Sequence, residues 1–276
     1  MITGASDGIG KEFALQLAKK GYNLILVSRT QSKLDVLALE IEAESRYYKP
    51  EVRTLAVDFA KASEADYDKM AALANELEVG ILVNNVGLSH SCPVPFALTE
   101  KEVIKDIIEI NCHATLRVTS LVLPGMLKRK RGLVVTLGSF GGLIPSPLLA
   151  TYSGSKAFLQ HWSAAVASEL EGSGVDVQFV VPYLITSAMS KISRPSFFIP
   201  TPKAFVTSVL DKIGNAGGSG HYPWSCTPYH SHALIQWTIE NTLGLGSKTV
   251  IRYIRNMHHT IRARALRKAA RNAKIM

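Results

Sequence analysis

Short apolar segments alternate with amphipathic stretches along most of the chain. Runs of strand-forming residues occur at 23–28, 52–57, 79–84, 132–138 and 175–181, and the stretches between them show helical periodicity. Apolar strands separated by helices are typical of a parallel sheet that is covered on both faces. We therefore predict an α/β fold, and 276 residues with 47% hydrophobic residues suit one large domain.

The region 188–228 interrupts this pattern. It is rich in proline and contains a glycine cluster at 217–220, which indicates an insertion after the sixth strand. Such a segment either covers a ligand or is a structural excursion, and the sequence favours neither. We predict a domain over 1–228 that includes this insertion, followed by C-terminal helices with a basic tail over 229–276.

Positive charge is concentrated at the C-terminal end. Nine of the 31 Lys and Arg residues and no acidic residue lie from Lys248 onward, which leaves 22 basic residues against 22 acidic ones elsewhere. Val250, Ile254, Met257 and Ile261 share one helical stripe opposite the arginines. This pattern predicts a basic amphipathic helix at an anionic membrane surface, with attachment that weakens as salt rises. A solvated or partner-binding helix is one alternative. Nucleic-acid binding is another, and we do not predict it because aromatic residues do not interleave with these charges.

Neither a membrane span nor a metal site is predicted. No run of eighteen or more apolar residues occurs, although a bilayer-spanning helix needs about twenty. Cys92, Cys112 and Cys226 are odd in number and widely spaced, which fits a reducing compartment rather than a disulfide framework. The histidines lack acidic or cysteine neighbours at a ligand spacing.

Glycines near the amino end precede a helical pattern that runs from Lys11 to Lys20. Gly4, Gly8 and Gly10 would allow a tight strand-to-helix turn, which brings bare backbone N–H groups against a pyrophosphate at the positive end of the helix. An ordinary glycine loop is the alternative at this spacing.

The residues that close the next apolar run indicate which dinucleotide would bind. An acidic residue at this point would hydrogen-bond a ribose 2′-hydroxyl, but Ser28 and Arg29 stand here instead. A guanidinium suits a 2′-phosphate, so we predict NADPH rather than NADH. An exposed loop arginine is the alternative.

A tyrosine and a lysine four residues apart carry the candidate chemistry. Tyr152 and Lys156 would lie on one helix face, where the ammonium can stabilise the ionised phenol and lower its pKa. A phenol with a lowered pKa can act as a general acid near neutral pH. The pair alone would be an ordinary helix surface, but further motifs stand around it in order.

The chain resembles the short-chain dehydrogenase/reductase family from Ile2 to about Thr186. The matching motifs are Thr3-Gly-x-x-x-Gly-x-Gly10, Asp58, Asn84-Asn-Val-Gly87, Asn111, Ser139, Tyr152-x-x-x-Lys156 and Pro182 to Thr186. Within the family it looks most like the microsomal very-long-chain 3-oxoacyl-CoA reductases and their steroid 17-keto reductase relatives. Val86 in Asn-Asn-Val-Gly, the sequence Val181-Pro-Tyr183, and the segments Met189–Ile192 and Pro200–Pro202 carry this narrower likeness.

The resemblance implies a Rossmann-like doubly wound sheet and an NADPH-dependent oxidoreductase. The implied reaction reduces a 3-oxoacyl-CoA to the 3-hydroxyacyl-CoA in very-long-chain fatty acid elongation, at the cytoplasmic face of the endoplasmic reticulum membrane, with partners in an elongation complex. One alternative is a reductase of steroid or other bulky lipid ketones. Another is a truncated, inactive scaffold at a membrane surface.

The resemblance also assigns residue roles. Tyr152 would donate a proton, Ser139 would hydrogen-bond the carbonyl oxygen, Lys156 would lower the pKa of Tyr152 and bind the nicotinamide ribose, and Asn111 would hold a water. A strand-end cap and a satisfied helix asparagine are the alternatives for Ser139 and Asn111. The implied cofactor residues are Gly4, Ser6, Asp7, Gly8, Ile9, Gly10, Ser28, Arg29, Asp58, Asn85, Gly87, Tyr152, Lys156, Pro182, Ile185 and Ser187.

Two positions depart from the family pattern. Only Met1 and Ile2 precede Thr3, so the first strand is expected to be truncated, and its neighbours are expected to have unpaired ladders. This start predicts an amino-terminally shortened form of a longer protein. Tyr183 replaces the usual glycine, which puts the local backbone path in question.

Overall fold

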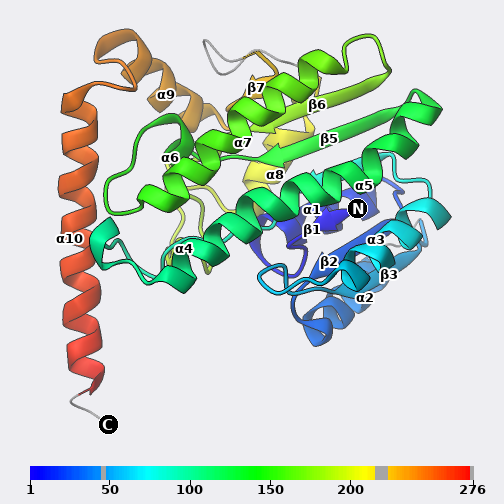
Figure 1. The fold of residues 1–276 in the computed structure, drawn as a ribbon, viewed down its shortest axis with the longest axis horizontal. Coiled ribbons are helices and arrows are strands. Elements are labelled where there is room, and N and C mark those ends of the chain that lie inside the picture. The colour runs from blue at the N-terminus through cyan, green and yellow to red at the C-terminus, as the bar shows by residue number, and fades with distance from the viewer. Residues whose placement is uncertain (45–47, 215–222, 274–276) are drawn as a thin grey trace.

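The computed structural model describes residues 1–44, 48–214 and 223–273. Seven parallel strands form one sheet in the order β3-β2-β1-β4-β5-β6-β7 (Figure 1). The strands are β1 (Ile2–Thr3), β2 (Leu24–Ser28), β3 (Val52–Ala56), β4 (Ile81–Asn84), β5 (Gly132–Leu137), β6 (Val175–Val180) and β7 (Ser225–Cys226). Five of them coincide with the predicted apolar runs, and the doubly wound parallel sheet is confirmed.

Helices cover both faces of the sheet because the strands carry apolar side chains on both sides. The helical elements are α1 (Gly8–Lys19), α2 (Gln31–Glu44), α3 (Glu64–Glu76), η1 (Phe96–Leu98), α4 (Lys101–Ile108), the π-helical turn η2 (Glu109–His113), α5 (Ala114–Arg129), α6 (Phe140–Leu143), α7 (Ala150–Glu169), α8 (Pro202–Leu210), α9 (His230–Thr242) and α10 (Lys248–Ala273). Helices α1, α2 and α8 pack on one core cluster, and α3, α5 and the end of α7 pack on another.

The short first strand still joins its neighbours. Ile2 pairs with Leu26 of β2 and with Val83 of β4. The amino group of Met1 donates a hydrogen bond to the Ile81 carbonyl at 2.7 Å, and burial lowers the pKa of this amino group to about 5. The expectation of unpaired ladders is therefore wrong where Met1 to Thr3 lie between β2 and β4, because these three residues fill the gap.

The region 188–228 contains more than a covering loop. Helix α8 packs against α1, where Gln16 Nε2 donates a hydrogen bond to the Lys203 carbonyl at 3.1 Å. Strand β7 extends the sheet by pairing with β6. The glycine cluster at 217–220 lies outside the described residues. Only the part of this region that precedes α8 is left to act as a substrate cover, and this role stays a prediction.

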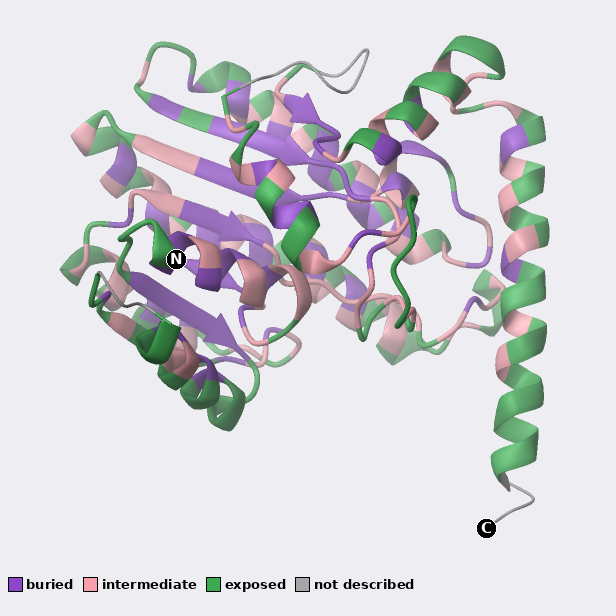
Figure 2. Cartoon of the chain, turned by 180° about the vertical axis from the view of Figure 1, so that it is seen from behind, coloured by how far each residue is buried: buried purple, intermediate pink, exposed green. Residues whose placement is uncertain are grey.

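The last helix packs along the body and then extends beyond it (Figure 1; Figure 2). Val250 is buried, and Ile254 packs on the same cluster as Phe140 of α6. The apolar stripe that we expected at a membrane surface is thus partly used to contact the protein itself. The residues of α10 from Arg264 to Asn272 are almost all exposed. Within the described ranges, no helix is both long and apolar enough to cross a bilayer.

Candidate active site

The glycine turn forms a tight link between β1 and α1. Gly4 and Gly8 adopt positive φ angles of 64° and 55°, which favour glycine, and Asp7 caps the helix by accepting a hydrogen bond from the Gly8 N–H at 2.6 Å. A side chain at Gly10 would collide with the Gly4 carbonyl, whereas one at Gly8 would contact Ser187 at 3.9 Å. The tight strand-to-helix turn predicted from the spacing is therefore present, and its contact with a pyrophosphate stays a prediction.

Asn85 holds this turn against β4. Its side-chain amide donates hydrogen bonds to the Thr3 carbonyl at 3.0 Å and to the Gly4 carbonyl at 3.1 Å, and its backbone N–H donates to Thr3 Oγ1 at 3.0 Å. Asn85 thus shapes the floor of the turn through bonds that the sequence does not reveal. The predicted contact of Asn85 with the adenosine ribose stays a prediction.

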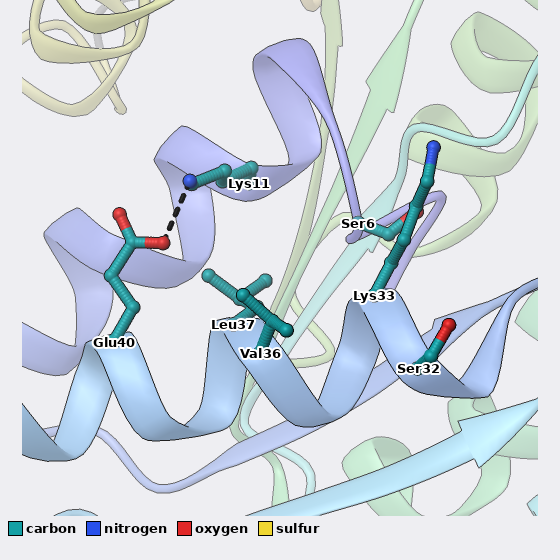
Figure 3. A pocket seen from close by; sticks show the side chains of 7 residues that line it. All are labelled: Ser6, Lys11, Ser32, Lys33, Val36, Leu37 and Glu40. Atoms are coloured by element: carbon teal, nitrogen blue, oxygen red, sulfur yellow. Dashed lines mark ion pairs between the residues drawn. The ribbon is translucent and has the colours of Figure 1, made fainter.

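Cationic and hydroxyl groups gather where β2 ends. Ser28 is buried, and its Oγ has no hydrogen-bond partner among the described residues, while Arg29 is exposed and forms no ion pair with them. Beside them lies a hollow of about 280 Å³ between α1 and α2, lined by Ser6 and Lys33 among others (Figure 3). These groups fit a 2′-phosphate. The sequence analysis missed Lys33, although it stands four residues after Arg29.

The other predicted cofactor residues lie around the carboxyl ends of the strands. Asp58 follows β3 and accepts the Ala60 N–H at 3.2 Å, and Ser187 faces Gly8 across the glycine turn. The Ile185 carbonyl accepts a hydrogen bond from Ser190 Oγ at 2.6 Å, and the Pro182 carbonyl accepts the Phe140 N–H at 2.9 Å. The segment from Pro182 to Ser187 thus lies between the glycine turn and α6. Ile9, in the first turn of α1, is partly buried.

Ser139 and Tyr152 are brought together by α6 and α7. A side chain at Gly141 would begin 3.4 Å from Ser139 Oγ and 3.3 Å from Cε1 of the Tyr152 ring, so the two residues border the same space. Ser139 Oγ also accepts the Gly141 N–H at 3.0 Å, so the strand-end cap considered above is present as well. Two hydroxyl groups side by side can both hydrogen-bond one carbonyl oxygen.

Lys156 and Asn111 meet at Gly87. A side chain at Gly87 would begin 3.7 Å from Lys156 Nζ and 3.5 Å from Asn111 Oδ1, so glycine keeps this space open. Lys156 is buried and donates a hydrogen bond to the Leu137 carbonyl at 2.8 Å. Asn111 Oδ1 accepts the Leu88 N–H at 2.7 Å, and its Nδ2 donates to the Leu88 carbonyl and to Ser155 Oγ. The Asn111 side chain therefore has its polar atoms satisfied by protein, and the predicted water stays a prediction.

Burial sets the proton affinities of the two central groups. Burial raises the pKa of Tyr152 above its ordinary value, and the hydrogen bond with Ser139 partly offsets this rise. Burial lowers the pKa of Lys156 to about 8. The Lys156 ammonium donates its hydrogen bond to the Leu137 carbonyl, and none joins it to Tyr152 among the described residues. Its predicted lowering of that pKa therefore stays a prediction.

Tyr183 keeps an ordinary backbone path, since its φ angle is not positive. Its N–H donates a hydrogen bond to Nδ1 of the buried His232, and its ring lies 5.0 Å from the ring of Phe140. Tyr183 therefore occupies the position of the family's usual glycine without backbone strain. His232 is a second residue that the sequence analysis missed, because nothing in its neighbourhood along the chain links it to Tyr183.

Comparison with known proteins agrees with this arrangement. A family model described as short chain dehydrogenase matches residues 1–196. A very-long-chain 3-oxoacyl-CoA reductase from Phaeosphaeria nodorum is 59% identical over 276 residues, which cover 99% of this chain and 80% of the relative. A protein of the same name from Pyrenophora tritici-repentis is 60% identical with the same coverage.

A solved structure agrees as well. The short-chain dehydrogenase from Sphingobium yanoikuyae in complex with NADPH is 28% identical and superposes with a TM-score of 0.73, covering 87% of this chain and 90% of that one. The glycine turn, the paired hydroxyl groups and these similarities together confirm the resemblance found in the sequence. The chain belongs to the short chain dehydrogenase family.

Proposed function

We propose that this chain reduces a 3-oxoacyl-CoA to the 3-hydroxyacyl-CoA with NADPH, as a step of very-long-chain fatty acid elongation. The observation that carries the proposal is the pairing of Ser139 with Tyr152 beside the buried Lys156, on the same edge of the sheet as the glycine turn. Relatives that are 59% and 60% identical and named very-long-chain 3-oxoacyl-CoA reductases support the substrate class.

The chemistry divides between the cofactor and the protein. NADPH supplies the hydride when it is bound. Ser139 hydrogen-bonds the C3 carbonyl oxygen, and Tyr152 gives its proton to that oxygen as negative charge develops there. Lys156 stabilises the phenolate left on Tyr152, which requires its ammonium to turn from the Leu137 carbonyl toward the phenol.

Groups near the end of β2 account for the proposed preference for NADPH over NADH. Arg29 and Lys33 place two cations near the end of β2, and Ser6, which lines the hollow, offers a hydroxyl donor to a 2′-phosphate. Lys11 contributes less, because it is paired with Glu40 at 2.7 Å across the hollow (Figure 3).

The decisive experiment follows NADPH oxidation with three additions: a long 3-oxoacyl-CoA, a steroid ketone and no substrate. We expect turnover with the acyl-CoA well above that with the ketone. Faster turnover with the steroid would instead assign the chain to bulky lipid ketones. No turnover with either substrate, in a protein that still binds NADPH, would favour an inactive scaffold.

The location that we propose is the cytoplasmic face of the endoplasmic reticulum membrane, with possible partners in an elongation complex. The outward side of α10 supports a membrane contact, because it carries exposed basic residues and no acidic ones. On α9 and at its end, the side chains of Trp237 and Leu243 are exposed, as is that of Tyr253 on α10. Aromatic rings beside cations are typical of a membrane interface.

Vesicle flotation tests this contact. The protein should float with vesicles that contain anionic phosphatidylserine, should release as salt rises, and should not float with purely zwitterionic vesicles. Replacing Arg264, Arg267, Lys268 and Arg271 with Gln should abolish flotation. A control replaces the exposed Lys20, Lys61, Lys101 and Lys105 instead. Equal loss of binding in both variants would show that net charge alone, and not α10, attracts the vesicles.

A further inference from the structure

Helix α10 is bonded to two loops that border the candidate site. His258 is buried, and its Nδ1 lies 2.6 Å from the Pro147 carbonyl, in the loop just before α7. One turn further along, Arg262 Nη1 donates a hydrogen bond to the Pro93 carbonyl at 2.9 Å. Figure 1 shows α10 standing beside this side of the molecule. Two side chains of one helix therefore contact the backbone carbonyls of two separate loops.

These two loops are also bonded to each other. The Val94 N–H donates to the Leu148 carbonyl at 2.8 Å. The two carbonyls that α10 holds belong to the residues just before the two bonded ones: Pro93 precedes Val94, and Pro147 precedes Leu148. The first loop is attached on its other side as well, where Lys191 Nζ donates to the Ser91 carbonyl at 2.6 Å.

Leu148 adopts a backbone conformation that leucine rarely takes. Its φ angle is +68°, in the left-handed region, and its side chain is buried. A bulky residue there costs about 1–3 kcal/mol and persists only where its surroundings enforce the conformation. The contact of the Pro147 carbonyl with His258 and the bond of the Leu148 carbonyl with Val94 lie directly on either side of this residue. These two contacts restrain the backbone next to Leu148.

The strained residue stands at the start of the helix that carries Tyr152. Leu149 is the N-cap of α7, so Leu148 sets the direction in which the first turn begins. Ser153, next to Tyr152, returns to the same loop by accepting the Ser146 N–H at 3.1 Å, and it donates to the Gly141 carbonyl beside Ser139. A displacement of the loop before α7 would therefore also displace the first turn of α7.

We infer that His258 and Arg262 are positioning residues for the proposed reduction: they hold the Pro147 and Pro93 carbonyls, and so fix the first turn of α7 and the Tyr152 hydroxyl. The inference rests on the proposed function for its catalytic consequence. Neither residue touches the reacting atoms. Small displacements of a proton donor lower turnover strongly, because the reacting groups must be aligned.

The chain offers matched controls on the same helix. His259 and Arg255 are exposed neighbours of the same residue types. We expect His258→Leu and Arg262→Met each to lower kcat by about tenfold, with the affinity for NADPH unchanged. His259→Leu and Arg255→Met should keep kcat. His258→Asn should restore most of the turnover, because an amide N–H can donate from the place of Nδ1.

Hydrogen exchange gives a readout that needs no activity. In His258→Leu and Arg262→Met, the backbone amides of residues 146–153 should exchange faster than in the two controls, while those of β5 should not change. Arg262 is only partly buried, so its variant remains informative if His258→Leu does not fold. Unchanged exchange at 146–153 together with unchanged kcat would overturn the inference. If the unmodified protein reduces no 3-oxoacyl-CoA, the proposed function fails, and the exchange data still decide whether α10 holds this turn.

Discussion

The backbone N–H of Tyr183 donates a hydrogen bond to Nδ1 of His232 at 3.2 Å. On the other side of the ring, Nε2 lies 3.2 Å from the Phe198 carbonyl, so the neutral ring accepts with one nitrogen and donates with the other. One buried imidazole therefore ties the segment after β6 to the turn that ends near Ile199. The first of these segments also reaches the residue next to Ser139, because the ring of Tyr183 lies 5.0 Å from that of Phe140.

This histidine predicts a loss of stability in mild acid. Burial lowers the pKa of His232 to about 4, below the ordinary value of 6.5. As pH falls from 6.5 to 4, the unfolded chain takes up a proton that the folded chain refuses, so the free energy of unfolding should decrease, by at most about 1.4 kcal/mol per pH unit. His232 contributes its full stabilisation above pH 6.5. Urea unfolding at several pH values measures this slope.

A pair of variants isolates the contribution of His232. His232→Gln keeps an acceptor and a donor but cannot titrate, so the slope between pH 6.5 and 4 should become shallower. His259→Gln, at an exposed position on α10, is the matched control and should leave the slope as it is. An unchanged slope in His232→Gln would mean that other groups cause the acid sensitivity.

Gly10 in the glycine turn and Gly154 in α7 are expected to change stability in opposite directions when each is replaced by alanine. A side chain at Gly10 would meet the Gly4 carbonyl and the Asn85 amide, so Gly10→Ala should lower stability by about 1–3 kcal/mol and weaken NADPH binding. Gly154 lies in α7 with open space around it, so Gly154→Ala should raise stability by about 0.5–1 kcal/mol. Chemical unfolding and NADPH titration would measure both, and equal stability of the two variants would contradict the packing described for the turn.

The cations near β2 predict a change of cofactor preference. Arg29→Asp should shift the preference from NADPH toward NADH. A carboxylate repels the 2′-phosphate of NADPH and accepts a hydrogen bond from the 2′-hydroxyl of NADH. Lys33→Ala should weaken NADPH binding without affecting NADH. Arg131→Asp is a control for added negative charge, because Arg131 directly precedes β5 and so lies at the amino ends of the strands, away from Arg29. The ratio of kcat/KM values for the two cofactors is the measurement, and a constant ratio in Arg29→Asp would refute the phosphate assignment.

The sequence predicted the fold where the pattern was long enough to show a period. Strands such as β5 are apolar over several residues and were placed within a residue or two. Strands β1 and β7 have two residues each, too few for any alternation to be visible. Their pairing depends on backbone contacts with neighbouring strands, which a local pattern does not contain.

The site was predictable only where its residues share a motif. Tyr152 and Lys156 follow from helical spacing, whereas His232, His258 and Arg262 contact segments that are distant along the chain. The stripe on α10 illustrates a related limit. Amphipathicity predicts that Val250 and Ile254 are covered, but it does not distinguish a bilayer from the body of the protein, and the body covers them.

The most direct test of the account is turnover of Tyr152→Phe with NADPH and a long 3-oxoacyl-CoA. The ring is kept and only the proton donor is removed, so NADPH should bind with nearly unchanged affinity while turnover falls below about a tenth of the original. Tyr253→Phe, at an exposed position on α10, is the control and should keep full turnover. A Tyr152→Phe protein that keeps more than about a tenth of its turnover would contradict the assignment of Tyr152 as the acid.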